Sequence, residues 1–80
     1  MVSKLLSSLK LREVTIPNRM VVSPMQMYMA KSNGECTNWH LVHLGKFAAG
    51  KFGMVFTEVL CVEPRGRSTY SDAGIWSDAH

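Results

Sequence analysis

The sequence lacks the features of a membrane or secreted protein. No hydrophobic run among its 80 residues approaches the roughly 20 that a membrane-spanning helix needs. Serines and Lys10 interrupt the leucines near the N-terminus before the apolar core of a signal peptide could form. Only two cysteines are present, Cys36 and Cys61, and they follow no pairing pattern, which favours a reducing compartment. We therefore expect a cytoplasmic protein with no membrane segment.

The sequence also lacks clustered charge, repeats and low-complexity tracts. Its nine Lys and Arg residues give a net charge of +3, but they are spread along the chain. A nucleic-acid-binding surface would gather them on one face with aromatic residues among them, so we expect no nucleic-acid partner. The 46% hydrophobic and 19% charged residues are typical of a folded domain rather than a disordered one.

The most informative stretch runs from Met20 to Tyr28. Val21 and Val22 are β-branched and favour a strand, whereas Pro24 cannot donate a ladder hydrogen bond and biases Ser23 toward an extended conformation. We expect a buried strand over about 20–23. The large side chains that follow Pro24 are unsuited to a solvated turn, so they predict the wall of a cofactor or substrate pocket.

The flanking segments predict an α/β arrangement. Residues 9–16 alternate around Arg12-Glu13 as a short hairpin does. Asn33-Gly34 predicts a tight reversal, after which Thr37 or Asn38 can cap a helix over about 38–49. We expect a core-facing stripe on this helix and Gly50 and Gly53 at its end. The stripe consists of Leu41, Leu44 and Ala48, with Phe47 beside them.

A second strand over 54–62 is apolar on both faces except at Thr57 and Glu58. A strand, a helix and a strand in this order predict two parallel strands with a right-handed crossover. Parallel strands need further neighbours, and Ser77-Asp78 has the character of a helix start. We therefore expect residues 1–80 to be the N-terminal part of one longer domain. The alternative is a truncated, non-catalytic βαβ module that needs a partner chain.

Several motifs in matching order resemble the old yellow enzyme family of FMN-dependent ene-reductases, and its bacterial NADH:flavin oxidoreductase branch most closely. The resemblance covers residues 9–80. The motifs are Asn18-Arg19, Ser23-Pro24-Met25-x-x-Tyr28, His40-x-x-His43, Thr57-Glu58, Pro64-x-Gly66-Arg67 and Gly74-Ile75-Trp76-Ser77-Asp78.

This resemblance implies a TIM (β/α)8 barrel, of which the chain would supply the N-terminal hairpin, first strand, first helix and second strand. It implies that the full-length protein uses NAD(P)H to reduce the activated C=C bond of an α,β-unsaturated carbonyl compound. It also implies a homo-oligomer. The family's catalytic residues lie beyond position 80, so no catalytic residue is expected within 1–80 and the fragment alone should be inactive.

The resemblance further assigns a binding site. The residues implied to contact FMN are Ser23, Pro24, Met25, Gln26 and Val59. Tyr28 is implied to face the substrate. Position 26 is usually Cys or Thr in the family and position 59 is usually Ala or Gly, so Gln26 and Val59 are departures.

Two other groups of residues allow different interpretations. His40 and His43, with Cys36 nearby, could be drawn as a zinc site, but the spacing fits no established ligand pattern, and packing histidines are the preferred interpretation. Glu58 lies within an apolar strand, where an unpaired carboxylate is costly, so we expect an ion pair with a basic residue of this or a later strand. Arg67 is expected to hold its own loop rather than a phosphate.

Overall fold

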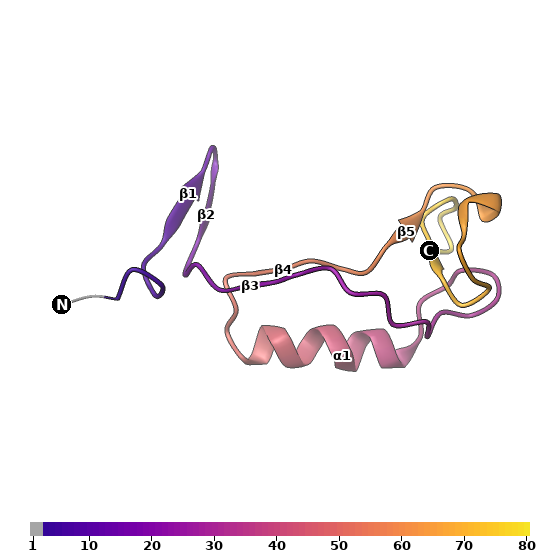
Figure 1. Cartoon of the computed structure of the whole chain (residues 1–80), viewed down its shortest axis with the longest axis horizontal. Helices are drawn as coiled ribbons and strands as arrows, with labels where there is room; N and C mark the ends of the chain where they lie inside the picture. The colour runs from indigo at the N-terminus through magenta and orange to yellow at the C-terminus, as the bar shows by residue number, and fades with distance from the viewer. Residues whose placement is uncertain (1–2) are drawn as a thin grey trace.

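The computed structural model describes residues 3–80 and shows an elongated βαβ arrangement (Figure 1). A hairpin lies at one end, two strands run side by side through the middle with a helix along them, and the loops gather at the other end. The elements are β1 (Leu9–Leu11), β2 (Val14–Ile16), β3 (Val21–Val22), α1 (Asn38–Ala49), β4 (Met54–Val55), β5 (Leu60–Cys61), a 3₁₀ turn η1 (Pro64–Gly66) and β6 (Ala73–Gly74).

The strands form three two-stranded ladders. β1 and β2 pair antiparallel, with Leu9 opposite Ile16, which confirms the hairpin. β3 and β4 pair in parallel, with Val22 opposite Val55, which confirms the predicted βαβ unit. The prediction of one continuous strand over 54–62 is wrong. Residues 56–59 leave the ladder, and β5 pairs in parallel with β6, a strand that the sequence did not predict.

Helix α1 has the predicted bounds, and Leu44 and Phe47 of the predicted core-facing stripe lie on its inner face, but the placement of Leu41 and Ala48 on that face is wrong. Leu41 is 75% exposed, and Ala48 is exposed as well. The inner face instead carries the i, i+3, i+4, i+7 set that begins at His40, the only buried residue of the helix. The other members of this set are His43, Leu44 and Phe47. The inward-facing His40 also caps the helix. Its ring accepts a hydrogen bond from the N–H of Thr37 at 3.0 Å.

Asn18 ties the N-terminal ends of the two central strands to the end of α1. Its Oδ1 accepts hydrogen bonds from Met20 N–H at 3.0 Å and Gly53 N–H at 2.9 Å, and its Nδ2 donates to the Lys51 carbonyl at 2.8 Å. Gly50 caps the helix in a right-handed conformation, and it is Lys51 that adopts the left-handed one, at φ 64°. Gly53 has no room for a side chain, since a Cβ there would run into Asn18.

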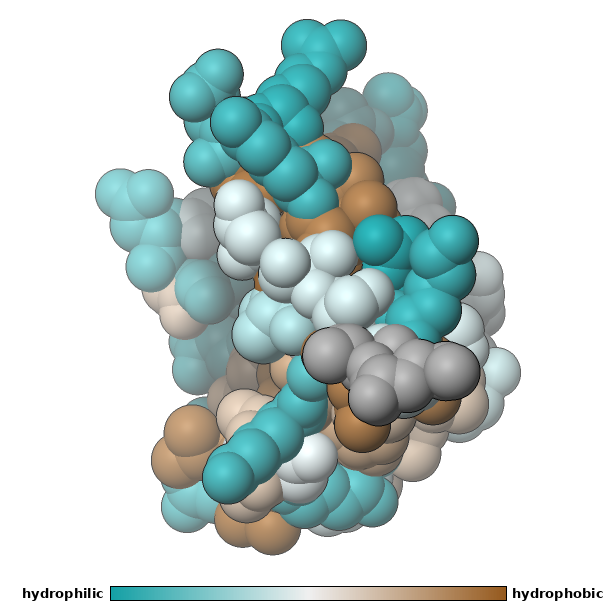
Figure 2. Space-filling model, turned by 90° about the vertical axis from the view of Figure 1, so that its left-hand side faces the viewer, coloured by the Kyte–Doolittle hydropathy of each residue, from teal (hydrophilic) through white to brown (hydrophobic). Residues whose placement is uncertain are grey.

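The chain is too extended to enclose a large core. Its radius of gyration is 15.3 Å, whereas a compact domain of this length would have about 12 Å. Among residues 3–80, only four hydrophobic residues are buried, namely Ile16, Val22, Cys61 and Ala73. Apolar residues of the central strands such as Val21 remain about half exposed. Seen from the hairpin end, hydrophilic side chains project from the hairpin, while hydrophobic ones lie open beneath it (Figure 2).

Across residues 3–80, the structure contains no helix with the length and apolar character required to cross a bilayer.

Candidate functional site

The segment that leaves β3 presents a row of accessible side chains at the carboxyl ends of the central strands. Ser23, Pro24 and Met25 are all exposed, and Met25 retains 48% of its surface. Tyr28 is 55% exposed. On the neighbouring segment after β4, Val59 is 58% exposed. The structure therefore leaves five of the six predicted site residues open to a ligand.

Tyr28 has an unusual backbone conformation, with φ at 62°. A bulky residue in the left-handed region is a genuine outlier and costs of order 1–3 kcal/mol, so the surroundings must hold it there. Hydrogen bonds to distant segments flank it: Met27 N–H donates to the Glu58 carboxylate at 3.2 Å, and Ala30 N–H donates to the Ser71 carbonyl at 3.1 Å. Strained, exposed aromatic residues of this kind are found at binding sites.

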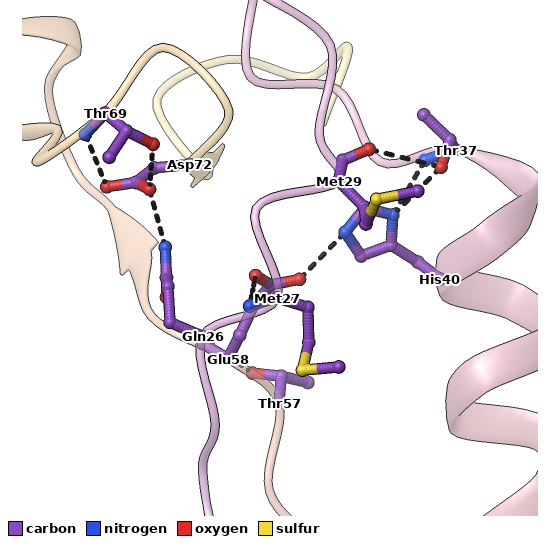
Figure 3. Close-up of polar contacts among 9 residues, drawn as sticks. All are labelled: Gln26, Met27, Met29, Thr37, His40, Thr57, Glu58, Thr69 and Asp72. Carbon is purple, nitrogen blue, oxygen red and sulfur yellow. Dashed lines mark hydrogen bonds and ion pairs between the residues drawn. The ribbon is translucent and has the colours of Figure 1, made fainter.

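Gln26, the sixth predicted site residue, is half-buried and anchored rather than free. Its Nε2 donates to Asp72 Oδ1 at 2.6 Å (Figure 3). Because an ionised carboxylate can only accept, this contact fixes the orientation of the amide and turns Oε1 away from Asp72. Oε1 is buried and has no partner among residues 3–80. The site thus contains one unsatisfied hydrogen-bond acceptor.

Asp72 is 1% exposed and was not singled out by the sequence. It accepts from Ser68 N–H at 2.7 Å, from Thr69 N–H at 3.2 Å and from the Thr69 hydroxyl at 2.7 Å, in addition to Gln26. These hydrogen bonds, that of the Thr69 hydroxyl first, hold the pKa of the carboxyl below its ordinary value although burial opposes them. Asp72 is therefore an ionised anchor for Gln26.

Glu58 joins the segment after β3 to the start of α1 (Figure 3). Its side chain is 6% exposed and its Oε1 lies 2.8 Å from His40 Nε2, while Oε2 receives the N–H of Met27. The His40 contact is at ion-pair distance, but Nε2 has no hydrogen bond of acceptable angle. The predicted partner, a basic residue on a strand, is wrong. Because the helix packs along the strands, the partner is a histidine of α1.

A cavity of about 150 Å³ lies beside this pair, lined mainly by apolar side chains together with Ser23 and Met25. It is too small for a flavin ring system, since ligand pockets typically measure about 300–1,000 Å³. Partial desolvation at this wall raises the pKa of the Cys36 thiol, and the negative charge of Glu58 raises it further. Within residues 3–80, no three His, Cys, Asp or Glu side chains lie close enough to share a metal ion.

A model of the NADH:flavin oxidoreductase / NADH oxidase family matches residues 4–80. The chain belongs to this family. The structure is also similar to that of the old yellow enzyme from Trypanosoma cruzi, with a TM-score of 0.80 and 27% sequence identity. The match covers 95% of this chain and 20% of the other, so the chain spans about one fifth of the length of that enzyme.

Membership of the NADH:flavin oxidoreductase family makes the βαβ unit a segment of the TIM-barrel fold of old yellow enzyme, although residues 3–80 themselves form no barrel. In such barrels the loops at the carboxyl ends of the strands carry the chemistry. The residues after β3 follow the carboxyl end of that strand, and Val59 lies in the segment between β4 and β5. The predicted site residues therefore lie at or after the carboxyl ends of the two central strands.

The structure adds Asp72 and His40 to the residues of this face. Two local patterns in the sequence could have identified them. Asp72 follows Ser68-Thr69 at a short spacing, at which a carboxylate can accept hydrogen bonds from nearby N–H and O–H groups. His40 lies three residues after Thr37, the position whose side chain bonds to the N-cap backbone N–H in a capping box. Arg67 Nε donates to the Pro64 carbonyl at 3.0 Å, which confirms that it holds its own loop, and its Nη1 donates to the Ser32 carbonyl of a distant loop.

Proposed function

We propose that this chain is the N-terminal, flavin-binding part of an FMN-dependent oxidoreductase that uses NAD(P)H to reduce the activated C=C bond of an α,β-unsaturated carbonyl compound. Family membership supports the oxidoreductase and its flavin. The observation that carries the assignment of the site is the row of exposed side chains after β3, which ends at the strained and accessible Tyr28.

The residues after β3 fit an FMN. Pro24 and Met25 provide an accessible apolar surface for a flat ring system, with the Ser23 hydroxyl beside them. The unsatisfied Gln26 Oε1 is the kind of acceptor that a ring N–H would complete. Val59 would border the ring from the segment between β4 and β5. When bound, FMN would take up a hydride from the nicotinamide and pass it to the substrate, while these residues bind and orient it.

Tyr28 would contact the substrate rather than the flavin. Among residues 3–80, its hydroxyl makes no hydrogen bond and its side chain is more than half exposed, so both the ring and the hydroxyl are free for a ligand. A conjugated carbonyl compound offers a flat face for the ring and an acceptor oxygen for the hydroxyl. We assign no general acid to the described residues.

The catalytic form would be a longer protein. Within residues 3–80, β3 and β4 pair only with each other, and Val21 of β3 remains 46% exposed. Further barrel strands would pair these edges and cover this side chain, since parallel sheets in proteins are buried on both faces. A module completed by a separate partner chain would cover the same edges and is the competing proposal.

The full-length protein carrying this segment tests the proposal. We expect it to purify yellow, to release FMN on denaturation, to be bleached anaerobically by NADPH or NADH, and to regain its colour on addition of 2-cyclohexenone. A protein that carries FMN and is bleached but is not reoxidised by the enone would contradict the substrate class. A colourless protein that takes up no FMN would favour the non-catalytic module.

A further inference from the structure

We infer that Glu58 is a positioning residue that holds Tyr28 in place for the substrate, by binding the backbone just before it and by being held in turn by His40. The inference rests on the proposed function, because it takes Tyr28 as a substrate contact. It concerns residues that touch neither the flavin nor the substrate in that proposal.

The first step is the connection between Glu58 and Tyr28. Glu58 Oε2 accepts the N–H of Met27, the residue that precedes Tyr28, at 3.2 Å. The two residues come from different elements, 31 positions apart. A hydrogen bond to a buried carboxylate is stronger than one between neutral groups, so it can restrain the peptide that leads into Tyr28.

The second step is the need for such a restraint. Tyr28 has φ at 62°, a conformation that its own side chain disfavours. Ala30 N–H is held by the Ser71 carbonyl on the far side, which leaves the Met27–Glu58 contact as the anchor on the near side. Release of that anchor would let Tyr28 relax toward an ordinary conformation and carry its side chain to another place.

The third step is the role of His40 in orienting the carboxylate. The ring accepts the Thr37 N–H at Nδ1, so Nδ1 carries no proton and the ring proton is on Nε2, which lies 2.8 Å from Glu58 Oε1. The N–H side of the ring therefore faces the carboxylate. Glu58 contacts two segments: Oε1 lies at ion-pair distance from His40 of α1, and Oε2 accepts the N–H of Met27 on the segment after β3.

These contacts predict different effects for two conservative substitutions, Glu58→Gln and His40→Gln. Glu58→Gln leaves one oxygen, which cannot serve both Met27 and His40, and its amide N–H₂ would oppose one of these donors. His40→Gln retains what His40 supplies, since a glutamine at this helix position can accept the Thr37 N–H with its oxygen and donate to Glu58 with its nitrogen. His40→Leu removes both functions.

The test uses the full-length flavin-loaded protein with 2-cyclohexenone as the probe. We expect Glu58→Gln and His40→Leu to raise the KM for the enone about tenfold, the effect of losing one charge-assisted hydrogen bond. His40→Gln should stay within about twofold of wild type. Flavin reduction by NAD(P)H should be unchanged in all three. Hydrogen exchange of the peptide that contains Met27 should be about tenfold faster in Glu58→Gln.

A double-mutant cycle with Tyr28→Ala separates positioning from general stability. If Glu58 acts through Tyr28, Glu58→Gln should change the enone KM by less than about twofold once Tyr28 is absent. Asn18→Ala is the matched control, because Asn18 is buried and makes three hydrogen bonds at the opposite ends of the strands. Asn18→Ala should lower the free energy of unfolding, and it should change the enone KM by the same factor with Tyr28 present and with Tyr28→Ala.

Two outcomes would overturn the inference. Equal, additive KM effects of Glu58→Gln with and without Tyr28, in a wild-type protein that binds FMN and reduces the enone, would leave the proposed function standing and remove the positioning role. A wild-type protein without flavin would remove the proposed function and this inference with it.

Discussion

His40 Nε2 lies 2.8 Å from Glu58 Oε1, and both side chains are less than 10% exposed. Removal of His40 leaves Glu58 Oε1 without its polar neighbour, while Oε2 keeps the Met27 N–H. We expect His40→Leu to lower the free energy of unfolding by about 1–3 kcal/mol, because a buried carboxylate oxygen is left unsatisfied. Denaturant-induced unfolding of the full-length protein measures this. Leu41→Ala, next in sequence but exposed, should stay within about 0.5 kcal/mol of wild type. Equal losses of unfolding free energy in His40→Leu and Leu41→Ala would show that the contact between His40 and Glu58 does not stabilise the protein.

The Asp72 carboxylate should make stability depend on acid pH. Its folded-state pKa is lowered from the ordinary 3.8, so its contribution is fully present above that value and is lost as the pH falls through the folded-state pKa. Asp72→Asn removes the titration and cannot satisfy all four donors. We expect this variant to have a lower melting temperature than wild type at pH 7. The difference between the two melting temperatures should become smaller below about pH 4. A difference that is independent of pH would contradict the ionised anchor.

The Cys36 thiol should be slow to react at neutral pH although it is exposed. Desolvation and then the charge of Glu58 raise its pKa above the ordinary 9.0, which leaves less of the reactive thiolate. The alkylation rate with iodoacetamide, followed against pH by mass spectrometry, should reach half its maximum above pH 9.0. Glu58→Gln should lower that midpoint. Cys61, which is 6% exposed, serves as the unreactive reference. An unchanged midpoint in the variant would exclude the influence of Glu58.

Gly34 should not tolerate a side chain. It has φ at 85°, and a Cβ would lie 2.5 Å from Trp76 Cη2. We expect Gly34→Ala to destabilise the protein by roughly 1–3 kcal/mol, through backbone strain and displacement of the tryptophan. Gly45→Ala is the control, because Gly45 lies in α1 with no atom of residues 3–80 within 4 Å of the added carbon. Gly45→Ala should raise the free energy of unfolding of the protein by about 0.5–1 kcal/mol. Thermal melting that ranks the two variants in the reverse order would contradict the packing described.

The sequence was sufficient to predict the elements that depend on local signals. The hairpin, the bounds of α1 and the break at Pro24 follow from alternation, capping and the missing proline N–H, which act within a few residues. The parallel pairing of β3 and β4 follows from the order strand, helix, strand.

The features that could not be predicted depend on contacts between distant segments. Hydrophobicity alone predicts that Leu41 lies on the inner face of α1, whereas the structure turns His40 inward to meet Glu58, 18 positions away along the chain. Nothing near Gln26 in the sequence indicates that Asp72, 46 positions away, holds its side chain. Neither partner could be identified from spacing, since each comes from a loop whose path the local sequence does not determine.

The most direct measurement of the central claim, that the segment after β3 binds the flavin, is an FMN titration of the full-length apoprotein carrying Met25→Glu, followed by quenching of flavin fluorescence. Leu11→Glu is the matched control, because Leu11 is 44% exposed and Met25 48% exposed, and Leu11 lies in the distant hairpin. We expect Met25→Glu to raise the Kd for FMN at least about a hundredfold, since it would place a charge against the ring, and Leu11→Glu to leave it within about threefold of wild type. Equal affinities in the two variants would contradict the account.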